Sequence, residues 1–302
     1  MSDLLGYSFA LFVWPGILGA TVLALLYLWL GRKLTARLQG RKGPPFGQPL
    51  FDLVKLLGKR TVVPGEANRA LFLTLPVVSV AAVVFGLAIV PVPGTPVRSF
   101  PGDVVLLLFL LEVPVLCEVV AGYVTHSIYG EVSAMREGVL MLGYNVPFLA
   151  AVVAMAQHAG SFGLADLNAA PLGPVTVFAA IAFLLAVPAR LKSTPFSIAN
   201  AEHEILGGAH VEYNGAPLAL LELAHGLEIV LLIDLFVVLF VPRSGAVVID
   251  ALVYLAASIA AVCLVTTIAA ATARMTGVRA FRFYWVWGGM AAAASIAAAV
   301  AR

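Results

Sequence analysis

The residues Pro217-Leu-Ala-Leu-Leu-Glu-Leu-Ala-His-Gly-Leu-Glu-Ile-Val-Leu-Leu-Ile-Asp-Leu-Phe-Val-Val-Leu-Phe-Val241 form one long apolar run. A helix of this length, rising about 1.5 Å per residue, crosses the roughly 30 Å of hydrocarbon in a bilayer. Within the run stand four ionisable side chains: Glu222, His225, Glu228 and Asp234. Carboxylates in hydrocarbon are costly, and they usually serve ion or proton handling. The run therefore predicts a membrane helix with a function in ion transfer.

The surrounding stretch is unbalanced in charge. Between Lys192 and Arg243 there is no Lys or Arg, yet this stretch holds six of the 16 acidic residues and three of the five histidines. These carboxylates need positive charges from elsewhere, either from the basic first loop or from another subunit.

Composition places the whole chain in the membrane. Hydrophobic residues make up 62% of its 302 residues and charged residues 11%, with a mean hydropathy of +1.02. Water cannot solvate so much apolar surface. We therefore predict an all-α integral membrane protein, a single membrane domain over residues 1–302. Eight apolar runs are long enough to span, near 8 to 30, 70 to 90, 103 to 124, 138 to 158, 174 to 190, 217 to 241, 249 to 270 and 280 to 301.

The basic residues predict an orientation. With eight spans, 15 of the 18 Lys and Arg residues fall on one side, and only Arg98, Arg243 and Arg302 fall on the other. Basic loops usually face the cytoplasm. We therefore expect the first loop in the cytoplasm and both termini outside. The net charge of +2 gives no indication of nucleic-acid binding, and we expect no nucleic-acid partner.

The chain lacks the usual signatures of a catalytic or metal centre. Cys117 and Cys263 stand alone in different spans, so we expect free buried thiols and no iron–sulfur or zinc site. Neither a nucleotide-binding glycine loop nor a dinucleotide fingerprint occurs. We expect no catalytic residue, no metal and no cofactor in this chain.

The long first loop carries a helical pattern. Between Gln48 and Lys59, Asp52, Lys55 and Lys59 share one face and apolar residues cover the rest. This pattern predicts an amphipathic helix at the membrane interface or against a partner, or a plain connecting helix that shields the bundle.

Two groups of ionisable residues are candidates for a proton path. Glu112 and Glu118 share the third predicted span, about 9 Å apart along a helix. Glu222, His225 and Glu228 step by three residues and form a slanted stripe that can line one cavity. Asp234 falls on the other side and must find another partner or face a different subunit. The alternative is that each group is a neutral, hydrogen-bonded latch between helices.

Two cytoplasmic motifs resemble those of a known family. They are Gln39-x-Arg41-x-Gly43-Pro44 with Gln48-Pro49 and Asp52-x-x-Lys55-Leu56, and Pro195-Phe196…Glu202-x-Glu204…Val211-Glu212-Tyr213-x-Gly215. They resemble the membrane-arm subunit 1 of respiratory complex I and the homologous subunit of membrane-bound group 4 [NiFe] hydrogenases, including formate hydrogenlyase. The eight-span count agrees with that resemblance, which covers essentially the whole chain.

The resemblance implies partners and positions. The loops from Gly31 to Arg69 and from Arg190 to Ala216 would contact hydrogenase-like small and large subunits, which carry iron–sulfur clusters and, in a hydrogenase, nickel and iron. Antiporter-like membrane subunits and lipid would complete the surroundings, in a bacterial or archaeal cytoplasmic membrane. The implied docking residues are Arg37, Gln39, Arg41, Gly43, Pro44, Asp52 and Lys55 in the first loop, and Pro195, Phe196, Glu202, Glu204, Glu212 and Tyr213 in the later one.

Departures from the complex I pattern favour the hydrogenase branch. Gly31, Ser197 and Asn200 stand where the complex I pattern has acidic residues. The sequence therefore predicts a membrane-anchoring, ion-coupling subunit of a hydrogenase-type complex without a redox centre of its own. The alternatives are the quinone-chamber subunit of a complex I and an autonomous secondary transporter that uses its polar spans as a substrate site.

Overall fold

The structure is a computed structural model that describes residues 12–13, 16–93 and 99–301, without the side chains of residues 202 and 203. Every regular element in these ranges is helical, which confirms the predicted all-α class. The elements are α2 (Ile17–Leu38), α3 (Gln48–Leu57), α4 (Arg69–Ile89), α5 (Asp103–Val124), α6 (Ile128–Ala159), α7 (Leu164–Ala169), α8 (Pro174–Arg190), α9 (Glu202–Ile205), the 3-10 turn η1 (Gly208–Val211), α10 (Gly215–Phe240), α11 (Val247–Ala271), α12 (Gly277–Phe283), the π-helical turn η2 (Tyr284–Gly288) and α13 (Gly289–Val300).

Seven helices in the described part of the chain are long and apolar enough to cross a membrane, the last of them running from Gly277 to Val300. The eighth predicted span, near 174 to 190, corresponds to the apolar helix α8, which has 17 residues. Its length of about 25 Å is slightly less than the thickness of the hydrocarbon core. Seven of the eight predicted spans thus coincide with helices long enough to cross a membrane, and the eighth coincides with the shorter apolar helix α8.

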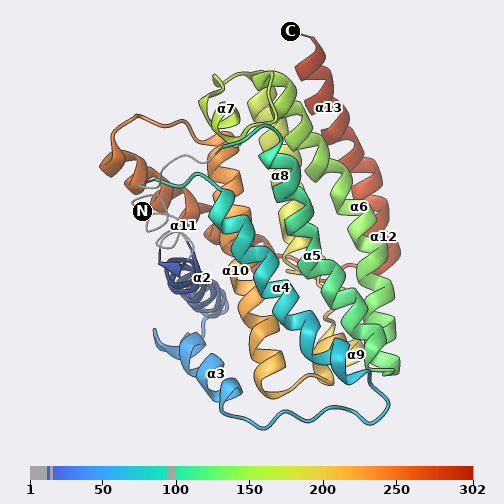
Figure 1. Cartoon of the computed structure of the whole chain (residues 1–302). Helices are drawn as coiled ribbons and strands as arrows, with labels where there is room; N and C mark the ends of the chain where they lie inside the picture. Colours follow the sequence, from blue (N-terminus) through green and yellow to red (C-terminus); the bar gives the residue numbers. More distant parts are fainter. Residues whose placement is uncertain (1–11, 14–15, 94–98, 302) are drawn as a thin grey trace.

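The helix with the four ionisable side chains of the opening run, α10, lies in the middle of the bundle (Figure 1). It packs against α2, α4 and α8. Of its most apolar 18 residues 78% are buried, against 17% for α2 and for α11. Figure 1 shows α2 nearly end-on while α4, α5, α6 and α10 run roughly upright, so the axis of α2 is at a large angle to the axes of these four helices. Glu228 and Asp234 of α10 are therefore buried among this chain's own helices, whereas the side chain of Glu222 is partly exposed.

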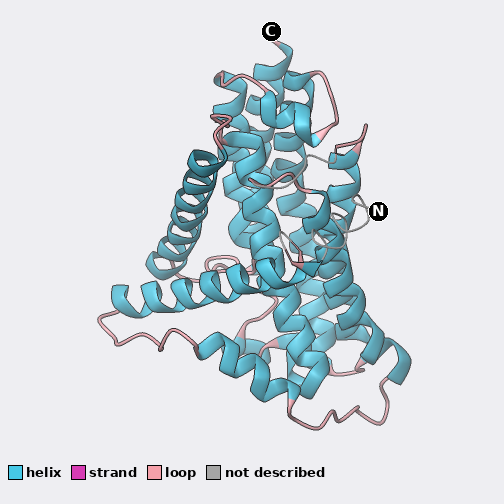
Figure 2. Ribbon diagram, turned by 60° about the vertical axis from the view of Figure 1, so that its left-hand side comes forward, coloured by secondary structure: helices cyan, strands magenta, loops and turns pink. Residues whose placement is uncertain are grey.

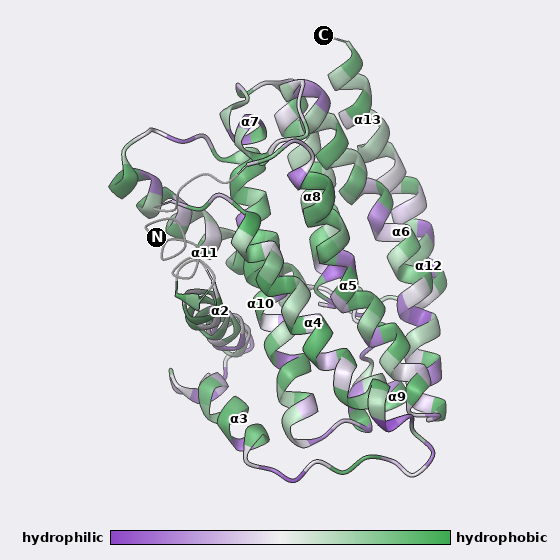
Figure 3. Ribbon diagram, viewed as in Figure 1, coloured by the Kyte–Doolittle hydropathy of each residue, from purple (hydrophilic) through white to green (hydrophobic). Residues whose placement is uncertain are grey.

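The loops gather at the two ends of the bundle, and the long first loop with α3 lies at the end that also holds α9 (Figures 1 and 2). Apolar residues follow the helices between the two ends, and hydrophilic residues mark the ends (Figure 3). The predicted amphipathic helix of the first loop is α3, which begins after Gly47 with Pro49 in its first turn.

Two helices extend beyond the predicted apolar runs. α2 continues to Leu38 and so includes Arg37, and α6 begins at Ile128, ten residues before the predicted start at 138. Charged residues end an apolar run without breaking a helix. The N-terminal part of α6 accommodates charged side chains because they have partners: Arg136 donates to Glu204 of α9, and Glu137 accepts a hydrogen bond from Tyr144 of α6.

A side-chain clip joins the first loop to the start of α10. The amide of Asn214 accepts a hydrogen bond from Val62 N at 2.8 Å and donates one to Val62 O at 2.9 Å. At Gly215, whose φ is +62°, a Cβ would lie 3.0 Å from Lys59 O. The two long loops that carry the motifs therefore lie against each other.

The cysteine prediction holds for one residue and is wrong in part for the other. Both thiols are free, and Cys117 is buried, but Cys263 is only partly covered. Cys263 lies on α11, which is one of the most peripheral helices.

Candidate functional site

The centre of the site is Arg190, the last residue of α8, whose side chain is fully buried. Its Nη1 lies 2.7 Å from Glu112 Oε1 of α5, and its Nη2 donates to Leu111 O at 2.6 Å. Asn145 of α6 bridges the pair, because its Oδ1 accepts from Arg190 at 3.3 Å and its Nδ2 donates to Glu112 Oε2 at 3.2 Å. The guanidinium lies over the Phe148 ring, 4.7 Å from its centroid. Side chains and backbone of two other helices thus fix this cation of α8.

Two further carboxyl groups interact electrostatically with the same guanidinium. Glu228 Oε1 of α10 lies 3.7 Å from Arg190 Nε, which is an ion-pair distance and too long for a direct hydrogen bond. Glu137 of α6 is 2% exposed, and Tyr144 donates to its Oε1 at 3.4 Å. We call Glu112, Glu137, Arg190 and Glu228 the Arg190 cluster.

A polar cavity of about 660 Å³ adjoins the cluster. Glu228 belongs to both, because it lines the cavity and faces Arg190. The ionisable residues that line the cavity are Glu118, Lys192, His210, Glu222, His225 and Glu228. Glu222 is 45% exposed at its side chain, so the polar groups run from an accessible carboxylate to a buried one.

Lys192 and His210 order the cavity wall. Lys192 Nζ forms an ion pair with Glu118 Oε2, and His210 Nε2 lies 3.3 Å from the other oxygen of that carboxylate. His210 Nδ1 is 3.9 Å from Glu222 Oε1. Burial lowers the pKa of Lys192 to about 8, against the opposing effect of Glu228 and Glu222. Burial and the charge of Lys192 lower the pKa of His210 to about 4, so its imidazole is neutral at pH 7.

The structure brings together most of the residues predicted for a proton path. Glu118, Glu222, His225 and Glu228 line one cavity, and Glu112 lies in the adjoining cluster. Asp234 stands apart, as predicted, and its partner lies within the chain. Tyr254 of α11 donates to Asp234 Oδ1 at 2.6 Å.

The positive charges that the acidic residues need come from a source that sequence reasoning did not identify. Within the stretch that lacks cations, Glu228 lies 3.7 Å from Arg190, which precedes the stretch, while Arg190 and Lys192 also pair with Glu112 and Glu118 of α5. Arg136 of α6 pairs with Glu204 at 2.6 Å and lowers the pKa of that carboxyl, first by its hydrogen bond and then by its charge. The basic first loop does not supply these pairs.

Sequence reasoning missed Glu137, Arg190, Lys192 and His210 as site residues. Arg190 and Lys192 counted only as loop cations that set the orientation, and Glu137 fell one residue outside a predicted span. A signal was available for Arg190 and Lys192, because they are the last cations before a stretch with none.

The later loop is anchored from within. Phe196 packs on Phe283 and Tyr284, with ring centroids 5.4 and 4.8 Å apart, and Tyr213 stacks on Phe72 at 4.1 Å. Pro195, Phe196 and Tyr213 are buried, whereas Glu204 is exposed and Glu212 partly so. The side chain of Glu202 lies outside the described residues. The buried members of the motif therefore shape the loop, and the carboxylates of Glu204 and Glu212 reach its surface.

The first-loop residues fold back onto α2. Pro44 O accepts a hydrogen bond from Trp29 Nε1 at 3.3 Å, and a Cβ on Gly43 would lie 2.6 Å from the Lys33 side chain. Arg32 and Asp52 form an ion pair at 2.8 Å, and the hydrogen bond from Arg32 lowers the pKa of Asp52. Arg41 donates to Gln39, and the side chains of Arg37 and Lys55 are exposed.

Across the described residues, no group of three or more His, Cys, Asp or Glu side chains is placed to hold a metal ion. The site instead consists of carboxylates, cations and imidazoles around a cavity. Such groups can pass protons over short distances or bind a cation, and they do not themselves carry electrons.

The chain is similar to a group of respiratory proteins. A family model described as NADH dehydrogenase matches residues 12–300. A subunit of the NADH-quinone oxidoreductase of Dehalococcoides mccartyi (strain ATCC BAA-2266 / KCTC 15142 / 195) is 29% identical over 72% of this chain, which spans 65% of that relative's length. The same-named subunits of Rhodospirillum rubrum and Syntrophotalea carbinolica are each 30% identical, over 76% and 80% of this chain and 74% and 79% of theirs.

A solved structure has the same fold. A chain of the membrane-bound sulfane sulfur reductase (MBS), an archaeal respiratory membrane complex, superposes with a TM-score of 0.87 at 26% identity, covering 99% of this chain and all of that one. Given the family match from residue 12 to residue 300 and the two relatives at 30% identity, this chain belongs to the NADH dehydrogenase family.

Proposed function

We propose that this chain is the membrane-anchoring and ion-coupling subunit of a complex I-like [NiFe] hydrogenase of the formate hydrogenlyase type. It holds the hydrophilic redox arm at the end that carries α3 and α9, on the cytoplasmic side. It links electron transfer in that arm to the movement of protons or sodium through the membrane. Family membership and the likeness to a respiratory membrane complex support the assembly.

One observation carries the ion-coupling part. The polar cavity extends from His210 of the later loop, past Glu222 of α10, to Glu228 in the Arg190 cluster. A charge that changes near the loop thereby acts on carboxyl groups that lie in the membrane interior. Coulomb interactions reach further there than in water, because the effective dielectric constant is lower.

The hydrogenase branch rests on the sequence departures. Asn200 lines the cavity, and Ser197 Oγ accepts a hydrogen bond from Arg274 Nε at 3.1 Å, where acidic residues of the complex I pattern would add negative charge. The partners proposed on this basis are hydrogenase-like large and small subunits, with iron–sulfur clusters and a nickel–iron centre, and antiporter-like membrane subunits.

A quinone-reducing complex is the second candidate, and one cavity favours it. About 220 Å³ in size, this cavity lies between α2, α3 and α10 and is largely apolar apart from Arg32, Asp52 and Glu222. The name of the relatives, as subunits of an NADH-quinone oxidoreductase, points the same way. A hydrophobic electron acceptor could enter there beside the polar cavity.

The two candidates differ in their partners and reactions. The complex is isolated by a tag on this chain, its companions are identified, and hydrogen turnover is compared with quinone reduction. A large subunit with two CxxC pairs and hydrogen turnover supports the hydrogenase. Quinone reduction with no such cysteines overturns it in favour of the second candidate.

The coupling part is tested by Glu228→Gln in the complex reconstituted into liposomes. We expect ion uptake per electron to fall at least about tenfold while the complex assembles, because an amide cannot exchange the proton that a carboxyl carries. Glu66→Gln is the matched control, since Glu66 is an exposed carboxylate of the first loop. Unchanged uptake in Glu228→Gln would exclude the relay.

A further inference from the structure

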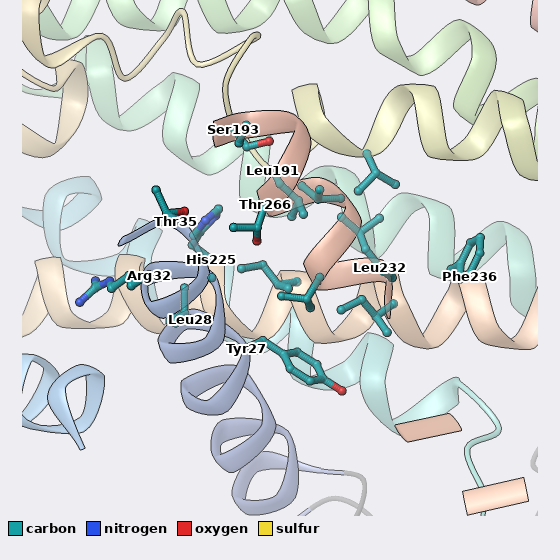
Figure 4. Close-up of a pocket in the computed structure, with 18 of the residues that line it drawn as sticks. Tyr27, Leu28, Arg32, Thr35, Leu191, Ser193, His225, Leu232, Phe236 and Thr266 are labelled. Atoms are coloured by element: carbon teal, nitrogen blue, oxygen red, sulfur yellow. The ribbon is translucent and has the colours of Figure 1, made fainter. Parts of the chain in front are cut away.

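A second large cavity, of about 550 Å³, lies between α2, α8, α10 and α11 (Figure 4). Its volume is within the range of small-molecule sites, which is roughly 300–1,000 Å³. Apolar side chains fill its walls, among them Leu28, Val187, Leu232, Phe236 and Val265. Of the ionisable residues that line the polar cavity, His225 also lines this one.

The chemistry of the cavity changes along its length. Phe236 lies at one end and Thr35, Arg32 and Ser193 lie toward the other (Figure 4). Arg41 and Lys42, both exposed, also line it. Three cations therefore line a mainly apolar space. Arg32 is ion-paired to Asp52, whereas Arg41 donates to the uncharged side chain of Gln39.

The cations at one end of the cavity and its apolar walls together determine which class of ligand fits. An anionic headgroup matches the cations, and hydrocarbon matches the apolar walls between membrane helices. A neutral amphiphile gains nothing from Arg41 and Lys42, and a free anion gains nothing from the apolar part. We propose that this cavity binds an anionic phospholipid, with its phosphate at Arg41 and Lys42 and an acyl chain between α2, α10 and α11.

The position of the site gives the lipid a further effect. His225 and Leu191 line both this cavity and the polar cavity, so they form the wall between the two. An acyl chain in the apolar cavity keeps water from reaching His225 on that side. This sealing effect rests on the proposed ion-coupling function, whereas the binding of the lipid does not.

The experiment uses the whole complex in nanodiscs that contain a photoreactive phosphatidylglycerol with its diazirine on an acyl chain. Labelled peptides are identified by mass spectrometry. We expect labelling of α11 around Val265, Thr266 and Ala269, which line the cavity. A phosphatidylcholine with the same acyl chains should label these residues much less.

Two variants test the headgroup and the cavity separately. Arg41→Gln with Lys42→Gln should lower labelling by phosphatidylglycerol by about 30-fold, because each basic residue near an anionic lipid contributes about fivefold. Lys59→Gln with Arg60→Gln is the matched control, since it removes two exposed charges of the same loop that do not line the cavity. Ala269→Trp should abolish labelling by filling the cavity.

Three results would overturn the proposal. Equal labelling by both lipids would show that the headgroup is not selected. Competition by inorganic phosphate alone, with no α11 label, would indicate a simple anion site. A neutral isoprenoid probe that labels α11 regardless of Arg41 and Lys42 would indicate a neutral amphiphile. Each result is independent of whether Glu228→Gln uncouples the complex.

Discussion

Single residues in this site have properties that only the fold confers. Lys192 follows an apolar helix and would be an ordinary loop cation, yet it lies buried against Glu118. Burial brings its pKa to about 8. The ammonium therefore persists below pH 8 and loses its proton as the pH rises through that value, which leaves Glu118 without its cation.

This titration predicts an alkaline limit on coupled transport. In the reconstituted complex, ion uptake should fall as the pH rises from about 7 to 9, and Lys192→Arg should remove that fall because a guanidinium stays charged at these pH values. Lys59→Arg, at an exposed position, is the control. An unchanged alkaline limb in Lys192→Arg would assign it to another group.

The proposed relay also belongs to this scale. Glu228 belongs both to the cavity wall and to the Arg190 cluster, which is why its replacement by Gln is expected to interrupt uptake whereas Glu66→Gln is not. Its identity as a candidate was visible from its spacing to Glu222 and His225. Its partner Arg190 was not visible, because the pairing joins α8 to α10 through tertiary packing alone.

At the scale of elements, the α5–α6 hairpin depends on close backbone contact. A Cβ on Gly122 would lie 2.5 Å from Gly130 O, and a Cβ on Gly130 would lie 2.6 Å from Gly122 O. Both Glu118 and Glu137 are held by these two helices, so the contact sets their separation.

Gly122→Ala should therefore destabilise the chain by about 1–3 kcal/mol, because overpacking forces the two backbones apart. Gly138→Ala is the matched control, since its Cβ would meet nothing within 4 Å. There the loss of backbone freedom in the unfolded chain makes Ala neutral or stabilising. Thermal denaturation of the purified complex measures both, and equal midpoints would contradict the close contact.

The sequence predicted most helices because the length of each apolar run, as a helix, is close to the thickness of the hydrocarbon core of a bilayer. It misplaced the start of α6 because Arg136 and Glu137 look like loop residues until Glu204 and Tyr144 are brought beside them. In the same way the first predicted run stops near residue 30, just before Arg32, although the helix continues to Leu38. Charged residues indicate where the chain leaves the hydrocarbon core, but they do not end the helix, which continues as long as its backbone hydrogen bonds do.

At the scale of the whole molecule, the clip between Asn214 and Val62 joins loops that are 152 residues apart. A partner that binds the first loop and displaces Val62 would therefore also displace Asn214, which directly precedes α10. Asn214→Ala should raise hydrogen exchange at the Val62 amide about tenfold, because one or two hydrogen bonds of about 1 kcal/mol each are lost.

The matched control for the clip is Glu66→Ala in the same loop, which leaves both bonds to Asn214 in place. Exchange measured by mass spectrometry over residues 58–68 detects the effect. Equal exchange in Asn214→Ala and in the unaltered complex would show that packing at Gly215, and not the amide, holds the loop.

The Arg190 cluster shares one cation between two helices. The guanidinium stays charged, and it lies within ion-pair distance of Glu112 on α5 and of Glu228 on α10. A proton on Glu112 removes that carboxylate's attraction to the guanidinium, which then acts on Glu228 alone, and a proton on Glu228 has the converse effect. Arg190 thereby links the protonation of α5 to that of α10.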